Sequence, residues 1–191
     1  MTRRRGLRRV GAGPLLLRAV VLGAGYAALL LAAPMLASSP VFAVVAGGVA
    51  VLAAIWVSSP WVAVVEHLAV IGWFGLTLAY DVVISPPQVA GLAAAIYLHH
   101  SAATLAAALP LDAVVAPSVL VGWSKRVAVV LGLALPLGWG VLALPELLDS
   151  SGQLWLPIAG TAAALAAAYG LVRLALPQRA PNRDGEPADH G

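Results

Sequence analysis

Six long apolar segments, separated by short stretches that are polar or contain proline, dominate the chain. A helix needs about 20 residues to cross the hydrocarbon core of a bilayer, which is about 30 Å thick. The apolar segments are residues 15–33, 41–57, 61–84, 88–109, 127–144 and 154–176. This pattern predicts an all-α fold: a polytopic integral membrane bundle of six transmembrane helices.

The separators contain residues that end helices. Two are Ser-Ser-Pro triplets that finish at Pro40 and Pro60, and a third is Ser-Pro-Pro at residues 85–87. Proline lacks an amide hydrogen and disfavours helix in the residue before it. Within the longer connection 110–126, residues 113–121 are apolar but too short to cross. They predict a segment in the headgroup plane, with Trp123 as an interfacial anchor.

Two further features concern helix packing. The last apolar segment carries two stripes of small residues, which favour close packing or self-association: Gly160, Ala164 and Ala168, and Ala162, Ala166 and Gly170. Pro136 lies inside the fifth segment, where its ring opposes a carbonyl of the preceding turn. We therefore expect a bend in that helix.

Composition supports the membrane interpretation. Of the 191 residues, 61% are hydrophobic and 10% are charged, whereas a soluble domain has about 25% charged residues. The excess of apolar surface must therefore face lipid. The chain has no cysteine, which excludes disulfides, thiolate metal ligands and thiol nucleophiles.

The distribution of basic residues predicts the orientation. Five arginines precede the first apolar segment, and a basic pair ends the connection 110–126. These residues are expected to fix orientation and to contact anionic lipid. They are Arg3, Arg4, Arg5, Arg8, Arg9, Lys125 and Arg126. Six crossings place all eleven Lys and Arg residues on the cytoplasmic side. Both termini are then cytoplasmic, and nucleic acid is not an expected partner.

This orientation divides the chain into a basic cytoplasmic tail (1–14), a six-helix transmembrane domain (15–176) and a disordered cytoplasmic tail (177–191). The arginine-rich, alanine-rich composition is typical of a GC-rich bacterial genome. The expected location is the bacterial cytoplasmic (inner) membrane. Cleavage of the first segment as a signal peptide is the less favoured alternative, because its apolar stretch is long and no clear cleavage site follows.

Most ionisable groups within the predicted membrane lie on the third and fourth segments. Helical spacing groups several of them with hydroxyl side chains in one polar intramembrane cluster: Glu66, Asp81, Tyr97, His100, Ser101 and Thr104. At 1.5 Å per residue from the Ser-Pro-Pro turn, Glu66 and His100 are predicted to lie about 9 Å apart along the helix axis. His67 and His99 point away from the cluster, His99 toward a side rich in alanine.

Three functions remain open for these residues. The cluster is either a proton relay or ligand site, or a hydrogen-bonded seam that fixes the helix register. No metal site is expected, because adjacent histidines on a helix are poor ligands for one ion and no H-E-x-x-H motif occurs. Haem would need His67 and His99 at one level, and residue counting separates them by about 9 Å. No cofactor is therefore expected.

The leading functional hypothesis is a non-enzymatic accessory or assembly subunit of a membrane complex. Its partners would be the lipid bilayer and other membrane proteins, or further copies of the chain joined through the sixth segment. A small proton-coupled transporter that uses Glu66 and His100 is the alternative. A membrane-embedded enzyme with residues around Glu66, His67 and Asp112 is a second alternative, although no nucleophile–base pair is recognisable in the connections.

Overall fold

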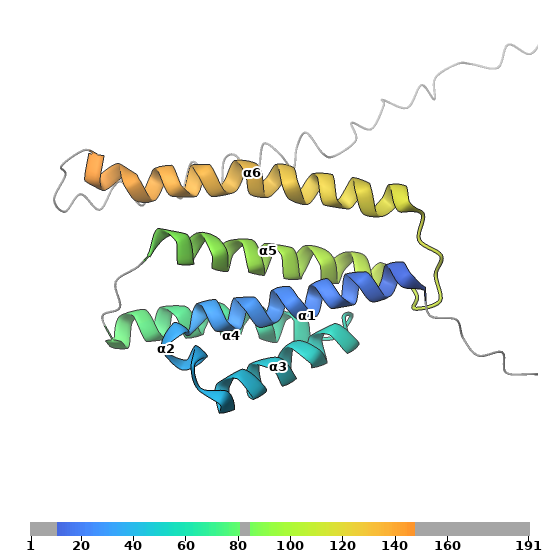
Figure 1. The fold of residues 1–191 in the computed structure, drawn as a ribbon, viewed down its shortest axis with the longest axis horizontal. Helices are drawn as coiled ribbons and strands as arrows, with labels where there is room; N and C mark the ends of the chain where they lie inside the picture. Colours follow the sequence, from blue (N-terminus) through green and yellow to red (C-terminus); the bar gives the residue numbers. More distant parts are fainter. Residues whose placement is uncertain (1–10, 81–84, 148–191) are drawn as a thin grey trace, which may run out of the picture. The chain divides into compact units, whose positions relative to one another are not determined.

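The computed structural model describes residues 11–80 and 85–147, in which every regular element is a helix. The elements are α1 (Ala12–Ala32), α2 (Pro34–Ala37), α3 (Pro40–Ile55), α4 (Trp61–Tyr80), α5 (Pro86–Ala108) and α6 (Pro117–Leu147) (Figure 1). The predicted all-α class is confirmed. By its internal contacts the chain divides into two units, Met1–Leu142 and Ala143–Gly191. Of the second unit, the described part is the end of α6, residues 143–147.

Four of these helices are long and apolar enough to cross a membrane. They are α1 with 21 residues, α4 with 20, α5 with 23 and the first 24 residues of α6. Helix α3 is equally apolar but has 16 residues, which is about 24 Å. Large apolar side chains also cover the outside, where Val44 is 74% and Leu78 83% exposed. These are the features of a membrane protein.

Several predictions fall outside the described residues. They are the sixth span at 154–176 with its small-residue stripes, the tail 177–191, most of the basic tail with its five arginines, and Asp81.

The serine–proline separators begin helices where the sequence predicts it. Helices α3, α4 and α5 begin at Pro40, Trp61 and Pro86. Ser39 caps α3 by accepting a hydrogen bond from the Phe42 amide at 3.4 Å, and Pro40 occupies the first helical position, where a missing amide hydrogen costs nothing.

The fifth long helix extends beyond the predicted span 127–144 at both ends. Helix α6 begins at Pro117, ten residues before the predicted 127, so residues 117–121 are helical and do not form a separate segment in the headgroup plane. Proline at a first helical position favours this earlier start. Lys125 and Arg126, expected in a loop, are exposed on the helix surface instead. The helix continues through Pro136 to Leu147.

Helix α1 is the centre of the bundle and packs against α5, α3 and α4 (Figure 1). The buried core around it consists largely of alanine: ten of its sixteen buried residues, with Leu17 and Val21 of α1 fully buried. Small side chains let helix backbones approach closely, which is the main source of helix association in lipid.

At two helix C-termini, side chains of neighbouring helices donate hydrogen bonds to the last carbonyl oxygens. Arg18 of α1 donates from Nη1 to the carbonyl oxygens of Ala54 and Ile55, at 2.8 and 2.7 Å, and so caps the end of α3. Gln88 of α5 donates to the Leu31 carbonyl at 2.9 Å, near the end of α1. The last carbonyls of a helix have no partner within it, and an arginine there also favours the helix dipole. These two caps fix the levels of α1, α3 and α5 relative to one another.

Gly25 marks the closest approach of α1 to a side chain of α5. A Cβ atom placed there would lie 2.7 Å from Nδ1 of His99 and 3.4 Å from Cγ1 of Val65. No larger residue fits without displacing the imidazole. Gly23 on the same helix is exposed, and a Cβ there would meet nothing within 4 Å.

We predict that Gly25→Ala destabilises the bundle by about 1–3 kcal/mol, the usual cost of overpacking a filled core. Gly23→Ala is the matched control and should be neutral or slightly stabilising, because alanine is the better helix former. Thermal unfolding of both variants in the same detergent measures the difference. Equal unfolding temperatures for the two variants would contradict this packing.

Candidate functional site

The two adjacent histidines of α5 have opposite environments. His99 is completely buried between α5 and α1, and its Nδ1 lies 2.9 Å from the carbonyl oxygen of Val21. It sits on the alanine-rich side of α5 with Ala95, Ala102, Ala103 and Ala106, all buried. The predicted orientation of His99 is therefore confirmed.

The hydrogen bond of His99 fixes its tautomer. A carbonyl oxygen only accepts, so Nδ1 must carry the hydrogen and donate it. Nε2 is buried and has no hydrogen-bond partner within the described part of the chain. His99 thus joins α5 to the backbone of α1, in the space that Gly25 leaves open.

His100 points in another direction and contacts α4. Its Nδ1 lies 3.0 Å from Oε1 of Glu66. The His100 side chain is 60% exposed and that of Glu66 is 21% exposed. The predicted axial offset of about 9 Å between these two residues is wrong. Counting residues from the Ser-Pro-Pro turn assumes that the turn alone sets the relative levels of α4 and α5. Packing of both helices on α1 sets those levels instead.

Two other members of the predicted polar cluster, Ser101 and Thr104, do not join this pair. Ser101 accepts a hydrogen bond from the indole Nε1 of Trp123 on α6, at 2.9 Å. Thr104 donates to the Ser101 carbonyl on its own helix at 2.9 Å and does not link Glu66 to His100. The single predicted cluster is therefore two separate contacts, one to α4 and one to α6.

His67 and Asp112 lie apart from both contacts. The Nδ1 of His67 is 2.6 Å from the carbonyl oxygen of Ala63 on its own helix, and the side chain is exposed. Asp112 is exposed in the connection between α5 and α6. No hydrogen bond or ion pair described for the resolved helices joins either residue to Glu66, so the enzyme alternative gains no support from them.

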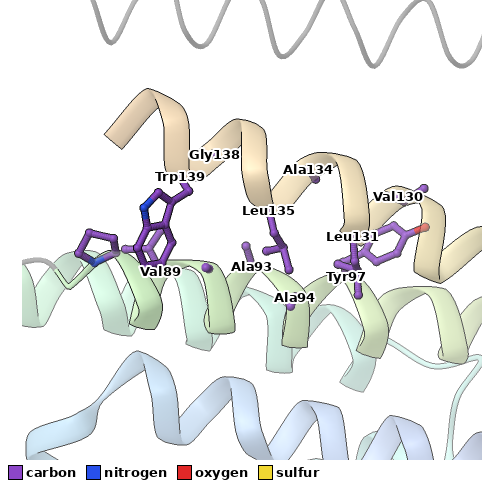
Figure 2. Close-up of a pocket in the computed structure, with 12 residues that line it drawn as sticks. Val89, Ala93, Ala94, Tyr97, Val130, Leu131, Ala134, Leu135, Gly138 and Trp139 are labelled. Atoms are coloured by element: carbon purple, nitrogen blue, oxygen red, sulfur yellow. The ribbon is translucent and has the colours of Figure 1, made fainter. Parts of the chain in front are cut away.

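Tyr97 faces an apolar pocket between α5 and α6. The pocket encloses about 300 Å³ and is lined by small and aliphatic residues, with Trp139 near one end and Tyr97 near the other (Figure 2). Alanines from both helices form much of its wall. Its lining offers hydrocarbon contact and a single hydroxyl, so it carries no recognisable catalytic chemistry.

The side-chain contacts between helices also define a common level along the helices. His99 is level with Val21, His100 with Glu66, and Ser101 with Trp123. At 1.5 Å per residue, neighbouring ionisable side chains fall within about 6 Å of one another along the axis. We call this set the polar belt; it comprises Arg18, Glu66, His67, His99, His100, Lys125 and Arg126.

The polar belt holds nearly every acidic, basic or imidazole residue in the described ranges. The others are Asp112 in the connection before α6 and Glu146 near the end of α6. The belt lies toward the end of the bundle at which α1 begins and α5 ends, which we call the basal end. From the belt, eight residues of α5 continue to Ala108, about 12 Å.

Sequence reasoning missed three parts of this arrangement. Arg18 was assigned to orientation alone, although it caps α3. The Trp123–Ser101 hydrogen bond and the space at Gly25 were also unforeseen. An isolated arginine one and a half turns into an apolar helix was the available signal for Arg18, because such a charge needs a partner.

The described residues contain no group of three or more His, Cys, Asp or Glu side chains placed to hold a metal ion. The arrangement instead offers one buried imidazole that donates to a backbone and one exposed imidazole that is paired with a carboxylate. Of these two adjacent histidines, only His100 can reach another molecule.

We predict that His99→Ala and His100→Ala differ strongly in stability. Loss of His99 leaves a cavity in the core and should cost about 2–4 kcal/mol. Loss of His100 removes an exposed pair and should cost less than about 1 kcal/mol. Unfolding curves of the two purified variants test this contrast, and a larger loss for His100→Ala would refute the assignment.

Comparison of the chain with protein-family models, with curated proteins and with solved structures finds no match. The functional argument accordingly depends on the geometry of the polar belt.

Proposed function

We propose that the chain is a non-enzymatic accessory or assembly subunit of a membrane complex, which docks to another membrane protein through the Glu66–His100 pair. The observation that carries this proposal is the 60% exposure of a His100 side chain whose Nδ1 is held by Glu66. An exposed polar pair of this kind contributes little to folding. Its polar atoms are therefore available to a partner.

The pair also presents a defined chemistry. With Glu66 ionised, the carboxylate accepts the Nδ1 hydrogen of His100. Nε2 then presents a lone pair away from Glu66, and this favours a partner that offers a hydrogen-bond donor. Polar contacts between helices are directional, and in apolar surroundings they specify which helices associate.

The topology is part of the proposal. We propose six transmembrane helices with both termini in the cytoplasm of a bacterial cell, in its inner membrane. The directions of the helices support this topology. Helices α1 and α5 are antiparallel, since His99 meets Val21 and Gln88 meets Leu31. Arg18, Lys125 and Arg126 lie toward the same basal end, which the positive-inside rule makes cytoplasmic.

A proton-coupled transporter is the second candidate, and one observation favours it. A direct contact of 3.0 Å lets Glu66 and His100 share a proton, which the predicted offset did not allow. Against it, most ionisable side chains of residues 11–80 and 85–140 gather at one level, and a conduit would distribute them along its axis. Docking accounts better for this distribution.

We predict that Glu66→Gln and His100→Ala each lower the amount of partner recovered by affinity purification in mild detergent by about tenfold. This corresponds to loss of one charge-assisted contact of about 1.4 kcal/mol. His67→Ala is the matched control, since His67 lies at the same level but bonds only to its own helix. Quantitative mass spectrometry of the recovered proteins gives the readout.

Equal recovery with His100→Ala and His67→Ala would contradict docking through this pair. The same variants, reconstituted in vesicles that carry a pH gradient, test the second candidate. Proton flux that is present in the parent chain and lost in Glu66→Gln would replace the docking proposal with transport.

A further inference from the structure

The α3–α4 turn reaches the same level as the polar belt. Arg18, a belt residue, bonds to the carbonyls of Ala54 and Ile55, so α3 ends at the belt. Residues 56–60 follow as an irregular turn before α4 begins at Trp61. An apolar helix, which hydrocarbon can surround, therefore ends at this level, and a non-helical turn, whose backbone needs polar partners, begins there.

Three of the five tryptophans in the described residues lie at or just basal to this level. Trp56 begins the turn and is 52% exposed. Trp61 is half-buried and lies five residues before Glu66, about 7.5 Å toward the basal end. Trp123 is level with Ser101, to which it donates. Tryptophan concentrates at membrane–water interfaces, where its ring meets apolar chains and its N–H meets polar groups.

We propose that the polar belt marks one boundary of the bilayer's hydrocarbon core, and that Lys125 and Arg126 there bind the phosphates of anionic phospholipids. Exposed cations within hydrocarbon cost several kcal/mol each, and an irregular turn cannot face lipid tails. Both costs vanish if the boundary coincides with the belt. This inference is independent of the docking proposal.

Measured from this boundary, α3 is about 6 Å shorter than a typical hydrocarbon core. Its 16 residues extend from the belt to the Ser-Pro start at Pro40, about 24 Å. Hydrocarbon cores are about 30 Å thick, and a short helix is accommodated by local thinning or by side chains that extend to the interface. The first turns of α6, residues 117–124, then project beyond the hydrocarbon core.

The lipid site follows from charge and exposure. Lys125 and Arg126 are exposed on consecutive positions of α6, one turn or less from Trp123. No ion pair with an acidic side chain is described for either residue within 11–80 and 85–140. Two exposed cations at the headgroup level complement a lipid phosphate, and arginine binds phosphate through two parallel hydrogen bonds.

Cysteine labelling tests the boundary, since the chain has no native cysteine. Four exposed positions on α6 are suitable: Ser118 and Ser124 basal to the cations, and Leu133 and Leu137 on the other side. In membranes, a water-soluble maleimide should label Ser118→Cys and Ser124→Cys at least tenfold faster than Leu133→Cys and Leu137→Cys. Equal rates, or faster labelling at Leu133, would overturn the boundary.

Lipid selectivity tests the phosphate site. Vesicles containing spin-labelled phosphatidylglycerol or spin-labelled phosphatidylcholine report the relative association of each lipid with the reconstituted protein. Lys125→Gln together with Arg126→Gln should lower the preference for phosphatidylglycerol by about fivefold or more, and Ser118→Ala together with Ser124→Ala should leave it unchanged. An unchanged preference in the Gln pair would overturn the lipid site, whatever the docking experiment shows.

Discussion

The cost of placing ionisable groups among lipid tails is the constraint on which this bundle depends. Seven such side chains of the described helices share one level. On the side of that level away from the basal end, the buried core is alanine, leucine and valine. Three belt residues bond to a neighbouring helix: Arg18 to α3, His99 to α1 and His100 to α4. The polar contacts of the bundle therefore also fix the levels of its helices.

The adjacent histidines divide two tasks. His99 occupies the space beside Gly25 and donates to the Val21 carbonyl, which joins α5 to the central helix. His100, one residue later and turned by about 100°, pairs with Glu66 on the exposed side. A helix gives two neighbouring residues different surroundings, so one dipeptide supplies both a structural contact and a contact available to a partner.

Much of the fold could be predicted from the sequence, and most of the site could not. Serine–proline separators determined the starts of α3, α4 and α5, because their effect is local. The orientation of His99 toward alanines also followed from helical spacing. The Glu66–His100 contact and the cap from Arg18 depend on the relative levels of the packed helices along their axes. Packing on α1 at positions such as Gly25 sets these levels, and counting residues from a turn does not reveal it.

The central claim, that the polar belt marks the edge of the hydrocarbon core, is most directly tested by the depth of α5. Spin labels on single cysteines at Ala93, Thr104 and Ala107, all exposed, report collisions with oxygen and with a water-soluble nickel chelate. We predict that oxygen dominates at Ala93 and the nickel chelate at Ala107, with the change near the level of His100. Oxygen dominance at all three positions, or a change located near Ala93, would contradict the account.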